Sequence, residues 1–282
     1  MSLESKINYL NGVTGNSDPI FFILGPCVIE SELHSLKMAE QIKKNSEKLK
    51  FNFIFKSSFD KANRSSLSNY RGVGIDEGLK ILQKVREQFE IPVITDIHEP
   101  NQADVVAEFV DVIQIPAFLC RQTDLLIAAG KTNKIINLKK GQFIPAENME
   151  HLVKKIESTG NTKIWICERG YTFGYNNLVV DCRNFPIMKR FNKPVVFDAT
   201  HSVQKPGGLG CSSGGDRSFV PSLTAAAVAQ GIASVFMEVH DEPEKALCDG
   251  PNSVRLSQLE GFLKYLLDLD NFAKSRKIPE LS

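Results

Sequence analysis

Eight short apolar runs, rich in β-branched and aromatic residues, recur along the chain and alternate with helical stretches. The runs cover residues 20–24, 52–55, 92–95, 111–115, 134–138, 163–167, 194–197 and 233–237. Most are nearly continuous apolar segments, which is typical of strands that are covered on both faces in a parallel sheet. Amphipathic patterns between or after them predict helices, most clearly at 33–49, 75–89, 224–232 and 256–272.

Eight strand–helix units in 282 residues, about 35 residues each, predict a (β/α)8 barrel. We expect a single domain over 1–282, with a short N-terminal extension over 1–19. The alternative is an open doubly wound sheet, which would usually carry a glycine-rich phosphate loop after its first strand. Gly25-Pro26-Cys27 follows the first run instead, and no G-x-G-x-x-G motif occurs at that point.

Charge and cysteine usage narrow the function classes. Lys and Arg number 34 and Asp and Glu 33, so nucleic acid is not expected as the main partner. No apolar run approaches the ~20 residues of a membrane span, and the N-terminus has no apolar core of signal-peptide length. The six cysteines include no Cys-x-x-Cys pair, which favours reduced thiols in a cytoplasmic protein. We expect most of them to be small buried hydrophobes.

Polar groups follow all eight runs, and the carboxyl ends of barrel strands are where catalysis takes place. Three of the five histidines, 98, 201 and 240, are among these groups. So are six cationic side chains: Lys56, Lys61, Arg64, Arg121, Lys139 and Arg169. Such a cluster suits phosphate or carboxylate groups, because each charge-assisted contact contributes about 1.5–3 kcal/mol. The residues alone therefore predict an enzyme that acts on one or two small phosphorylated substrates. Lys140, by contrast, reads as a surface lysine.

The same strand ends carry a candidate metal set of mixed donors: Cys27, His201, Glu238 and Asp249. Thiolate, imidazole and carboxylate together suit a divalent Fe, Zn, Mn or Co ion better than Ca or Mg. The set depends on placement in the barrel rather than on spacing. Cys120, Cys167 and the other histidines at strand ends therefore remain competitors.

Ten longer motifs carry a specific resemblance. They are GPCVIES at 25–31, FKSSFDKANRSS at 55–66, TDIHEP at 95–100, IQIPAFLCRQTDLL at 113–126, NLKKGQF at 137–143, ERGYTFGYNNLVVD at 168–181, FDATHSVQKPGGLG at 197–210, SGGDR at 213–217, FMEVHDEPEKALCDGP at 236–251 and LSQLEGFL at 256–263. From about residue 20 to about residue 267, the chain resembles 3-deoxy-D-manno-octulosonate 8-phosphate synthase. The sister family, 3-deoxy-D-arabino-heptulosonate 7-phosphate synthase, typically has Lys-Pro-Arg-Thr where this chain has the segment KANRSS at 61–66. That difference favours arabinose 5-phosphate over erythrose 4-phosphate.

The resemblance implies a condensation of phosphoenolpyruvate with D-arabinose 5-phosphate and water. The products would be 3-deoxy-D-manno-octulosonate 8-phosphate, used in lipopolysaccharide, and inorganic phosphate. Metal-free members of the family carry Asn at the position of Cys27, so this chain is similar to the metal-dependent class. The family also implies a homotetramer. Two alternatives stay open: the erythrose 4-phosphate synthase, and a non-catalytic barrel that binds phosphosugars.

The resemblance also assigns residues to roles. The phosphoenolpyruvate site would contain Lys61, Gln114, Ala117, Lys139 and Arg169, with Lys56 beside it. Asn63, Arg64 and Ser65 would hold the sugar phosphate, and Ser58 and Gln204 complete the predicted substrate pocket. Asp96 and His98 would orient substrate or water, and Asp249 would serve as both metal ligand and base, so that the predicted catalytic set is Cys27, Lys56, Asp96, His98, His201 and Asp249.

Two further expectations concern the rest of the chain. The glycine-rich stretch 206–215 lacks a Gly-Lys-Ser/Thr sequence, so we expect a loop that closes over the site rather than a nucleotide-binding loop. His240 is expected to be structural, and the remaining cysteines structural or incidental: Cys120, Cys167, Cys182, Cys211 and Cys248.

Overall fold

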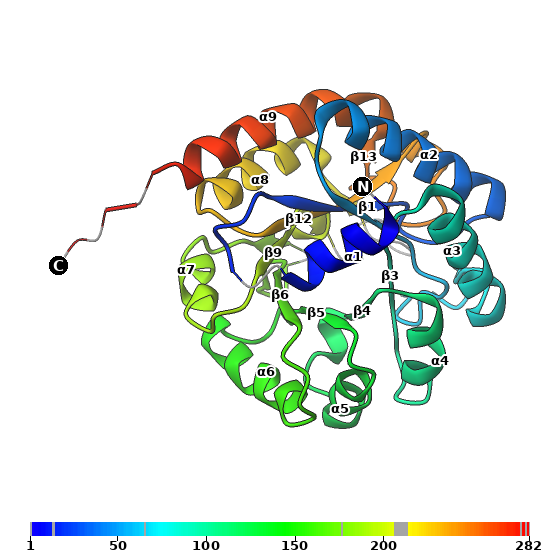
Figure 1. Ribbon diagram of the computed structural model, residues 1–282, viewed down its shortest axis with the longest axis horizontal. Helices are drawn as coiled ribbons and strands as arrows, with labels where there is room; N and C mark the ends of the chain where they lie inside the picture. The colour runs from blue at the N-terminus through cyan, green and yellow to red at the C-terminus, as the bar shows by residue number, and fades with distance from the viewer. Residues whose placement is uncertain are drawn as a thin grey trace.

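Eight parallel strands close into a barrel in the computed structural model, and helices surround them (Figure 1). The structure describes residues 2–12, 15–64, 66–175, 177–205, 214–276, 278–279 and 281. In order around the barrel, the strands are β1 (Phe21–Gly25), β2 (Phe53–Lys56), β3 (Val93–Asp96), β4 (Val112–Ile115), β5 (Ile135–Lys139), β6 (Ile164–Glu168), β9 (Val195–Asp198) and β12 (Ser234–His240). Parallel pairing of β12 with β1 closes the ring. The predicted (β/α)8 barrel is confirmed.

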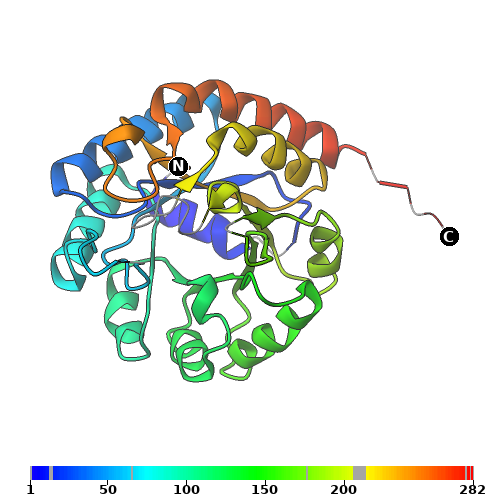
Figure 2. The ribbon, with the colours of Figure 1, turned by 180° about the vertical axis from the view of Figure 1, so that it is seen from behind.

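A helix follows each barrel strand, and these helices form the outer layer in both views (Figure 2). They are α2 (Glu32–Leu49), α3 (Ile75–Phe89), α4 (Gln102–Phe109), α5 (Thr123–Lys131), α6 (Met149–Glu157), α7 (Asn184–Lys189), α8 (Val220–Ala229) and α9 (Leu256–Lys274). None of the described helices is both long enough and apolar enough to cross a membrane.

The strand interiors explain why the apolar runs are continuous rather than alternating. In β1, Phe22 and Leu24 belong to the large cluster between strands and helices, whereas Phe21 and Ile23 point into the barrel. Successive side chains of a strand face opposite sides, so a sheet covered on both sides needs apolar residues at every position. The central cluster also contains Trp165, which is 2% exposed.

All eight strands start one residue later than the apolar runs predict, and most also end later. The reason is that parallel pairing continues into the polar residues after each run. Lys56, Asp96 and Lys139 are therefore the last residues of β2, β3 and β5. The strands hold these side chains rigidly at one end of the barrel.

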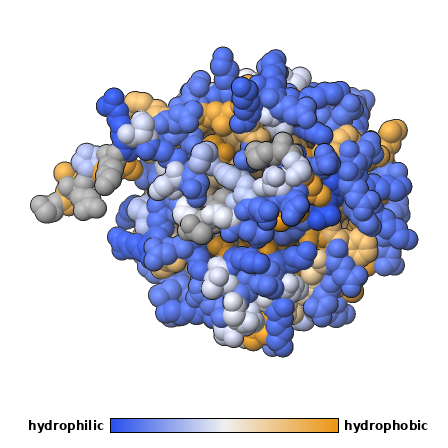
Figure 3. Space-filling model, in the orientation of Figure 1, coloured by the Kyte–Doolittle hydropathy of each residue, from blue (hydrophilic) through white to orange (hydrophobic). Residues whose placement is uncertain are grey.

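The N-terminal extension contains a helix that the sequence patterns did not predict, α1 (Leu3–Gly12). It lies across the end of the barrel where the strands begin (Figure 1). Leu10 packs on the interior cluster with Tyr9 beside it, and Lys6 donates a 2.9 Å hydrogen bond from its Nζ to the Glu90 carbonyl. Mostly hydrophilic residues cover this face of the molecule (Figure 3).

Small elements decorate the opposite end of the barrel. Two short hairpins join β7 (Tyr171–Thr172) to β8 (Leu178–Val179) and β10 (Gln204–Lys205) to β11 (Gly214–Gly215). A further short strand, β13 (Val254–Arg255), pairs with the end of β12. The predicted closing loop over 206–215 lies outside the described residues, apart from its last two glycines.

Candidate active site

A cavity of about 300 Å³ opens where the barrel strands end. Five cationic side chains line it: Lys56, Lys61, Arg64, Lys139 and Arg169. Other predicted site residues also line it: Asn63, Asp96, His98, Gln114, Ala117, His201, Gln204 and Asp249. These residues come from different strand ends and loops that follow them, so only the closed barrel brings them together.

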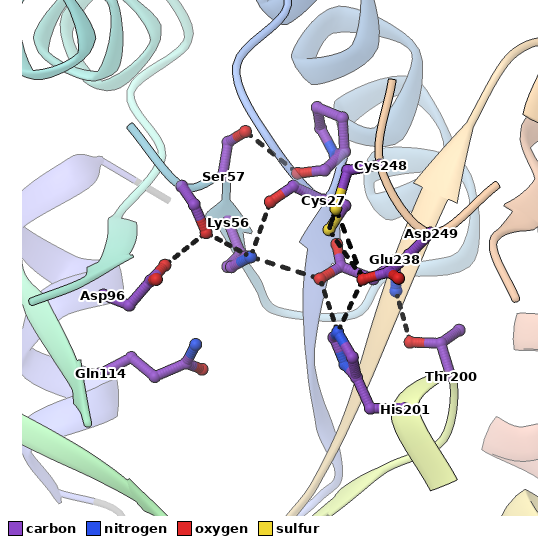
Figure 4. Close-up of polar contacts among 12 residues, drawn as sticks. Cys27, Lys56, Ser57, Asp96, Gln114, Thr200, His201, Glu238, Cys248 and Asp249 are labelled. Carbon is purple, nitrogen blue, oxygen red and sulfur yellow. Dashed lines mark hydrogen bonds and ion pairs between the residues drawn. The ribbon is translucent and has the colours of Figure 1, made fainter. Parts of the chain in front are cut away.

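The four predicted metal ligands lie in contact at one side of the cavity (Figure 4). Ligand atoms of Cys27, His201 and Glu238 all lie within 4.8 Å of one another. Asp249 joins them, with its Oδ2 at 3.2 Å from the Cys27 Sγ and 3.4 Å from the His201 Nε2. Cys27 follows β1, His201 follows β9, and Glu238 lies within β12, which Asp249 follows. These three strands are neighbours around the barrel.

Asp198 orients the His201 ring toward the other ligands, and both His201 and Cys27 hold a proton in the absence of metal. The His201 backbone N–H donates to the Asp198 carboxylate, which also lies 3.0 Å from the His201 Nδ1, so that Nε2 faces Glu238 and Asp249. Burial disfavours a charged His201, but Asp198 outweighs it and raises the pKa of His201 to about 10. Burial and the neighbouring Cys248 and Asp249 raise the pKa of the Cys27 thiol. A bound metal must therefore displace protons from both groups, as metal ligation generally requires.

One carboxylate oxygen of Glu238 indicates that a cation fits at this site. The Oε2 of Glu238 is fully buried and has no hydrogen-bond partner within the described part of the chain. A buried carboxylate oxygen without a partner is costly. A metal ion between Glu238, Cys27 and His201 would satisfy it. The donor set present in this chain therefore fits the metal that the family implies.

Lys56 connects this cluster to the other side of the cavity. Its buried Nζ donates to the Cys27 carbonyl and the Ser58 hydroxyl, both at 3.0 Å, and lies 3.2 Å from the Glu238 Oε1. The Ser58 hydroxyl in turn donates to Asp96. Ser58 does not itself line the cavity, so its contribution is to hold Lys56 and Asp96 in place.

Asp96 and His98 form a pair on the wall formed by the third strand. The His98 Nε2 lies 3.0 Å from the Asp96 Oδ2, and the His98 Nδ1 is buried without a partner among the described residues. Burial disfavours a charged Asp96, but His98, Lys56 and Lys61 outweigh it and hold the pKa of Asp96 well below its usual value. Asp96 therefore stays charged and accepts a hydrogen bond from one nitrogen of the His98 ring, which fixes the orientation of that ring.

Arg169 is a buried cation of the cavity, 4% exposed. Its Nη2 donates to the Gln204 side chain at 3.1 Å, and Gln204 donates onward to the Asp249 Oδ1 at 3.0 Å. The Nη1 of Arg169 is buried and has no hydrogen-bond partner within the described ranges. A guanidinium presented in this way is suited to an anion that supplies the missing acceptors.

Several residues differ from the sequence interpretation. Lys140 is not a surface lysine: it is fully buried, 3.5 Å from Glu168. Tyr171 of β7 covers it, and the Gly141 and Gly170 carbonyls accept from its Nζ. Arg121 is exposed and does not line the cavity. Ser65 lies outside the described residues.

Two residues that the patterns left out prove to belong to the site. Asp198 lies 2.6 Å from the Lys139 Nζ in addition to its contacts with His201. Cys248, expected to be structural or incidental, lies with its Sγ 2.8 Å from that of Cys27 and lines the cavity. For Asp198, the available signal was its position three residues before His201. For Cys248, it was its position directly before Asp249.

A (β/α)8 barrel with a cation-lined cavity and an adjoining thiol, imidazole and carboxylate cluster defines a class: enzymes of small anionic, typically phosphorylated, substrates. The chain matches the model of the DAHP synthetase I family over residues 3–275, and it belongs to that family.

Curated relatives cover nearly the whole chain. A protein from Cyanothece sp. is 58% identical over 253 residues, which is 90% of this chain and 93% of the relative. One from Geobacter sulfurreducens is 56% identical over 260 residues, or 92% and 96% of the two chains. One from Francisella tularensis is 52% identical over 271 residues, or 96% and 98%. All three are named 2-dehydro-3-deoxyphosphooctonate aldolase.

Proposed function

We propose that this enzyme condenses phosphoenolpyruvate with D-arabinose 5-phosphate and water, yielding 3-deoxy-D-manno-octulosonate 8-phosphate and inorganic phosphate for lipopolysaccharide synthesis. The names of its relatives support this reaction over the erythrose 4-phosphate reaction of the sister family. The observation that carries the proposal is the set of five cationic side chains around one cavity beside the ligand cluster.

Phosphoenolpyruvate carries a phosphate and a carboxylate on three carbons, so it needs several fixed cations close together. Arg169, Lys139 and Lys61 are assigned to these anionic groups, with Gln114 and Ala117 forming the adjoining wall. Lys139 is already held by Asp198 at 2.6 Å. Arg169 binds two oxygens at once when its free Nη1 takes part. Positioning of this kind contributes to catalysis because it removes the entropy cost of aligning the reactants.

The phosphate of the sugar is assigned to the loop after β2. Arg64 is held there by its Nε, which donates to the Tyr70 carbonyl at 2.9 Å. Asn63 also lines the cavity, and the family resemblance assigns Ser65 to the same role. A sugar phosphate anchored here would direct its aldehyde toward Cys27, His201 and Asp249.

In the reaction, C3 of phosphoenolpyruvate attacks the aldehyde, water adds at C2, and phosphate leaves by cleavage of its C–O bond. Asp96 and His98 are assigned to orient substrate or water, and Asp249 to take up a proton. A divalent ion held by Cys27, His201, Glu238 and Asp249 would supply Lewis-acid polarisation of the aldehyde or of a water molecule. Lys56 offsets the negative charge of Glu238 at 3.2 Å and keeps the cluster compact.

The direct test measures phosphate release from phosphoenolpyruvate with arabinose 5-phosphate and, separately, with erythrose 4-phosphate. Each assay is run before chelation, after chelation, and after addition of Fe, Zn, Mn or Co ions. We expect turnover of the five-carbon sugar alone, lost on chelation and restored by a divalent metal. The Cys27→Asn variant is expected to keep partial activity without metal, because metal-free members of the family carry Asn there.

Other outcomes would separate the alternatives. Preference for the four-carbon sugar would assign the chain to the sister reaction, and no turnover with either sugar would support a phosphosugar-binding barrel. Activity that survives chelation would remove Cys27 from the catalytic set. The proposal also includes one catalytic domain, a cytoplasmic location and a homotetramer, and light scattering of the purified protein tests the last of these.

A further inference from the structure

Two thiols lie in contact beside the cavity. The Sγ atoms of Cys27 and Cys248 are 2.8 Å apart, and the two side chains are 4% and 5% exposed. A disulfide bond is about 2.05 Å long, so less than 1 Å of approach separates these sulfurs from bonding distance. The Asp249 Oδ2 accepts from both thiols, at 3.2 and 3.5 Å, and holds them on the same side of the cluster.

Barrel closure, not sequence proximity, creates this contact. The two cysteines are 221 residues apart in the chain and follow β1 and β12, the two strands that pair to close the ring. Gly25 pairs with Glu238 in that register, two residues before Cys27. Cys27 lies two residues after the end of β1, and Cys248 lies in the loop after β12, eight residues beyond His240.

Cys248 is among the residues that line the cavity, whereas Cys27 is not. Cys120 and Cys167 are also buried and lie outside the cavity lining, and Cys182 is exposed on the surface. Among the described cysteines, only Cys248 thus combines access through the cavity with a second thiol in contact.

We propose that Cys248 and Cys27 are a site of reversible oxidation, at which a peroxide entering the cavity converts them into a disulfide. Cys248 first attacks the peroxide O–O bond, which gives a sulfenic acid and, from hydrogen peroxide, one water. The Cys27 sulfur then displaces the hydroxyl of that sulfenic acid, which forms the S–S bond and releases a second water. Two thiols are oxidised and one peroxide is reduced, so atoms and electrons balance.

The consequence follows from the position of Cys27 and rests on the proposed function. A sulfur bound in a disulfide no longer serves as a thiolate ligand, so the oxidised chain keeps His201, Glu238 and Asp249 but loses the fourth donor. Thiol reductants restore both cysteines and with them the complete set. A metal bound to Cys27 competes with the same sulfur, so metal-loaded protein is expected to resist the oxidation.

The test treats the chelated protein with hydrogen peroxide and maps the cysteines without any activity assay. Trypsin releases Cys27 in the peptide 7–37 and Cys248 in the peptide 246–255. Mass spectrometry of the non-reduced digest should find these two peptides linked, and dithiothreitol should separate them. Protein loaded with Zn before treatment should give little of the linked product. In a separate assay with metal added back after treatment, phosphate-release activity should fall in step with the linkage and return with dithiothreitol.

Matched variants make the assignment specific. Cys248→Ser should give no linked peptide and should resist reversible inactivation, whereas Cys182→Ser, at the exposed thiol, should behave as the unaltered chain. Thermal unfolding of both variants checks that they are folded. Peroxide-treated protein with peptides 7–37 and 246–255 unlinked, or with Cys248 oxidised only to sulfinic acid, would overturn the proposal. Because the linkage is read by mass, a failure of the proposed reaction would leave this result unaffected.

Discussion

Asp198 illustrates how a residue that touches neither substrate controls the site. It binds the His201 backbone and ring and lies 2.6 Å from Lys139, and it is fully buried. We expect Asp198→Asn to lower metal affinity and turnover by roughly 10- to 100-fold, the usual effect of removing a carboxylate behind a metal-ligating histidine. Metal affinity is measured by competition with a chelator, and kcat and KM by phosphate release.

The control for this variant is Asp104→Asn, an exposed position on α4. It should leave both quantities unchanged. Circular dichroism establishes that each variant is folded before affinity is compared. If Asp198→Asn binds metal as tightly as the unaltered chain, then His201 is oriented by other contacts and Asp198 is not a positioning residue.

Asp241 gives a prediction for pH. Partial burial disfavours its charged form, but Lys37 at 2.6 Å and His34 at 3.1 Å outweigh it and hold the pKa of Asp241 well below its usual value. A depressed pKa stabilises the fold above the unfolded value of about 3.9, and this stabilisation is lost as the pH falls below it. Asp241→Asn should therefore lower the free energy of unfolding by about 1 kcal/mol at pH 7.

Urea unfolding at a series of pH values tests this prediction. The difference between the variant and the unaltered chain should shrink as the pH falls from 5 toward 3, where Asp241 becomes protonated in the unfolded chain. Asp104→Asn again serves as the reference. A difference that grows as the pH falls from 5 toward 3 would show that the sign is wrong.

Only some of the individual site residues could be predicted from the sequence. Lys56 and Lys139 directly follow apolar runs, and Arg169 lies two residues after one, so position in a barrel predicts these three. Cys27, His201, Glu238 and Asp249 are not separable by spacing from Cys120, Cys167, His98 or His240, and the family resemblance selected them. The roles of Asp198 and Cys248 depend on the direction of a side chain across a closed ring, which no local pattern encodes.

Among the elements, β1 depends on one glycine. A Cβ on Gly25 would lie 2.0 Å from the carbonyl oxygen of Lys56 on the neighbouring strand, far inside van der Waals contact. Gly25→Ala must therefore push β1 away from β2 just before Cys27. Overpacking of this kind costs up to about 3 kcal/mol, and we expect that loss together with weaker metal binding. Urea unfolding and chelator competition measure the two effects.

Gly261→Ala on α9 is the matched control, since a Cβ there meets no heavy atom within 4 Å. Alanine in an exposed helix is favoured over glycine by about 0.5–1 kcal/mol, so this variant should be slightly more stable. Equal stability of the two variants would show that β1 adjusts without strain.

Patterning located the long elements better than the short ones. Helix α3 has the predicted bounds, whereas α8 begins at Val220 rather than 224. Pro221 could have indicated where α8 begins, because proline suits the first turn of a helix. The prediction followed the alanine-rich stretch instead, and so placed the start of the helix four residues too late. The two-residue strands of the hairpins are too short to show any period.

At the scale of the whole molecule, α1 ties the N-terminal segment to the barrel. Leu10 is 3% exposed and packs on the interior cluster formed where the strands begin. Leu10→Ala should lower the free energy of unfolding by about 2 kcal/mol through loss of buried apolar surface. It should leave kcat and KM unchanged, because the cavity lies at the other end of the barrel.

Leu33→Ala is the control for this prediction, because Leu33 on α2 is 79% exposed. It should change stability by no more than a few tenths of a kcal/mol. A drop in activity for Leu10→Ala without loss of fold would contradict the separation of the two ends. Chemical denaturation and phosphate release together decide between these outcomes.

The barrel itself was predictable because its signal is distributed over the entire chain. Eight continuous apolar runs at even spacing indicate a parallel sheet with helices on its outer face, and no single run has to be assigned correctly. Helix α1 was not predicted because it has few apolar residues, and Leu10 is its one buried side chain. Only the ring of strands creates the surface on which it packs.

Helix α1 covers the end of the barrel where the strands begin, and the cavity opens at the opposite end (Figure 1). The N-terminal segment and the cavity therefore lie at opposite ends of the barrel. A chain attached to a surface through the N-terminal end of α1 would have the open end of the barrel turned away from that surface, so the surface would not block the cavity. A reporter fused at that end instead would likewise lie away from the cavity.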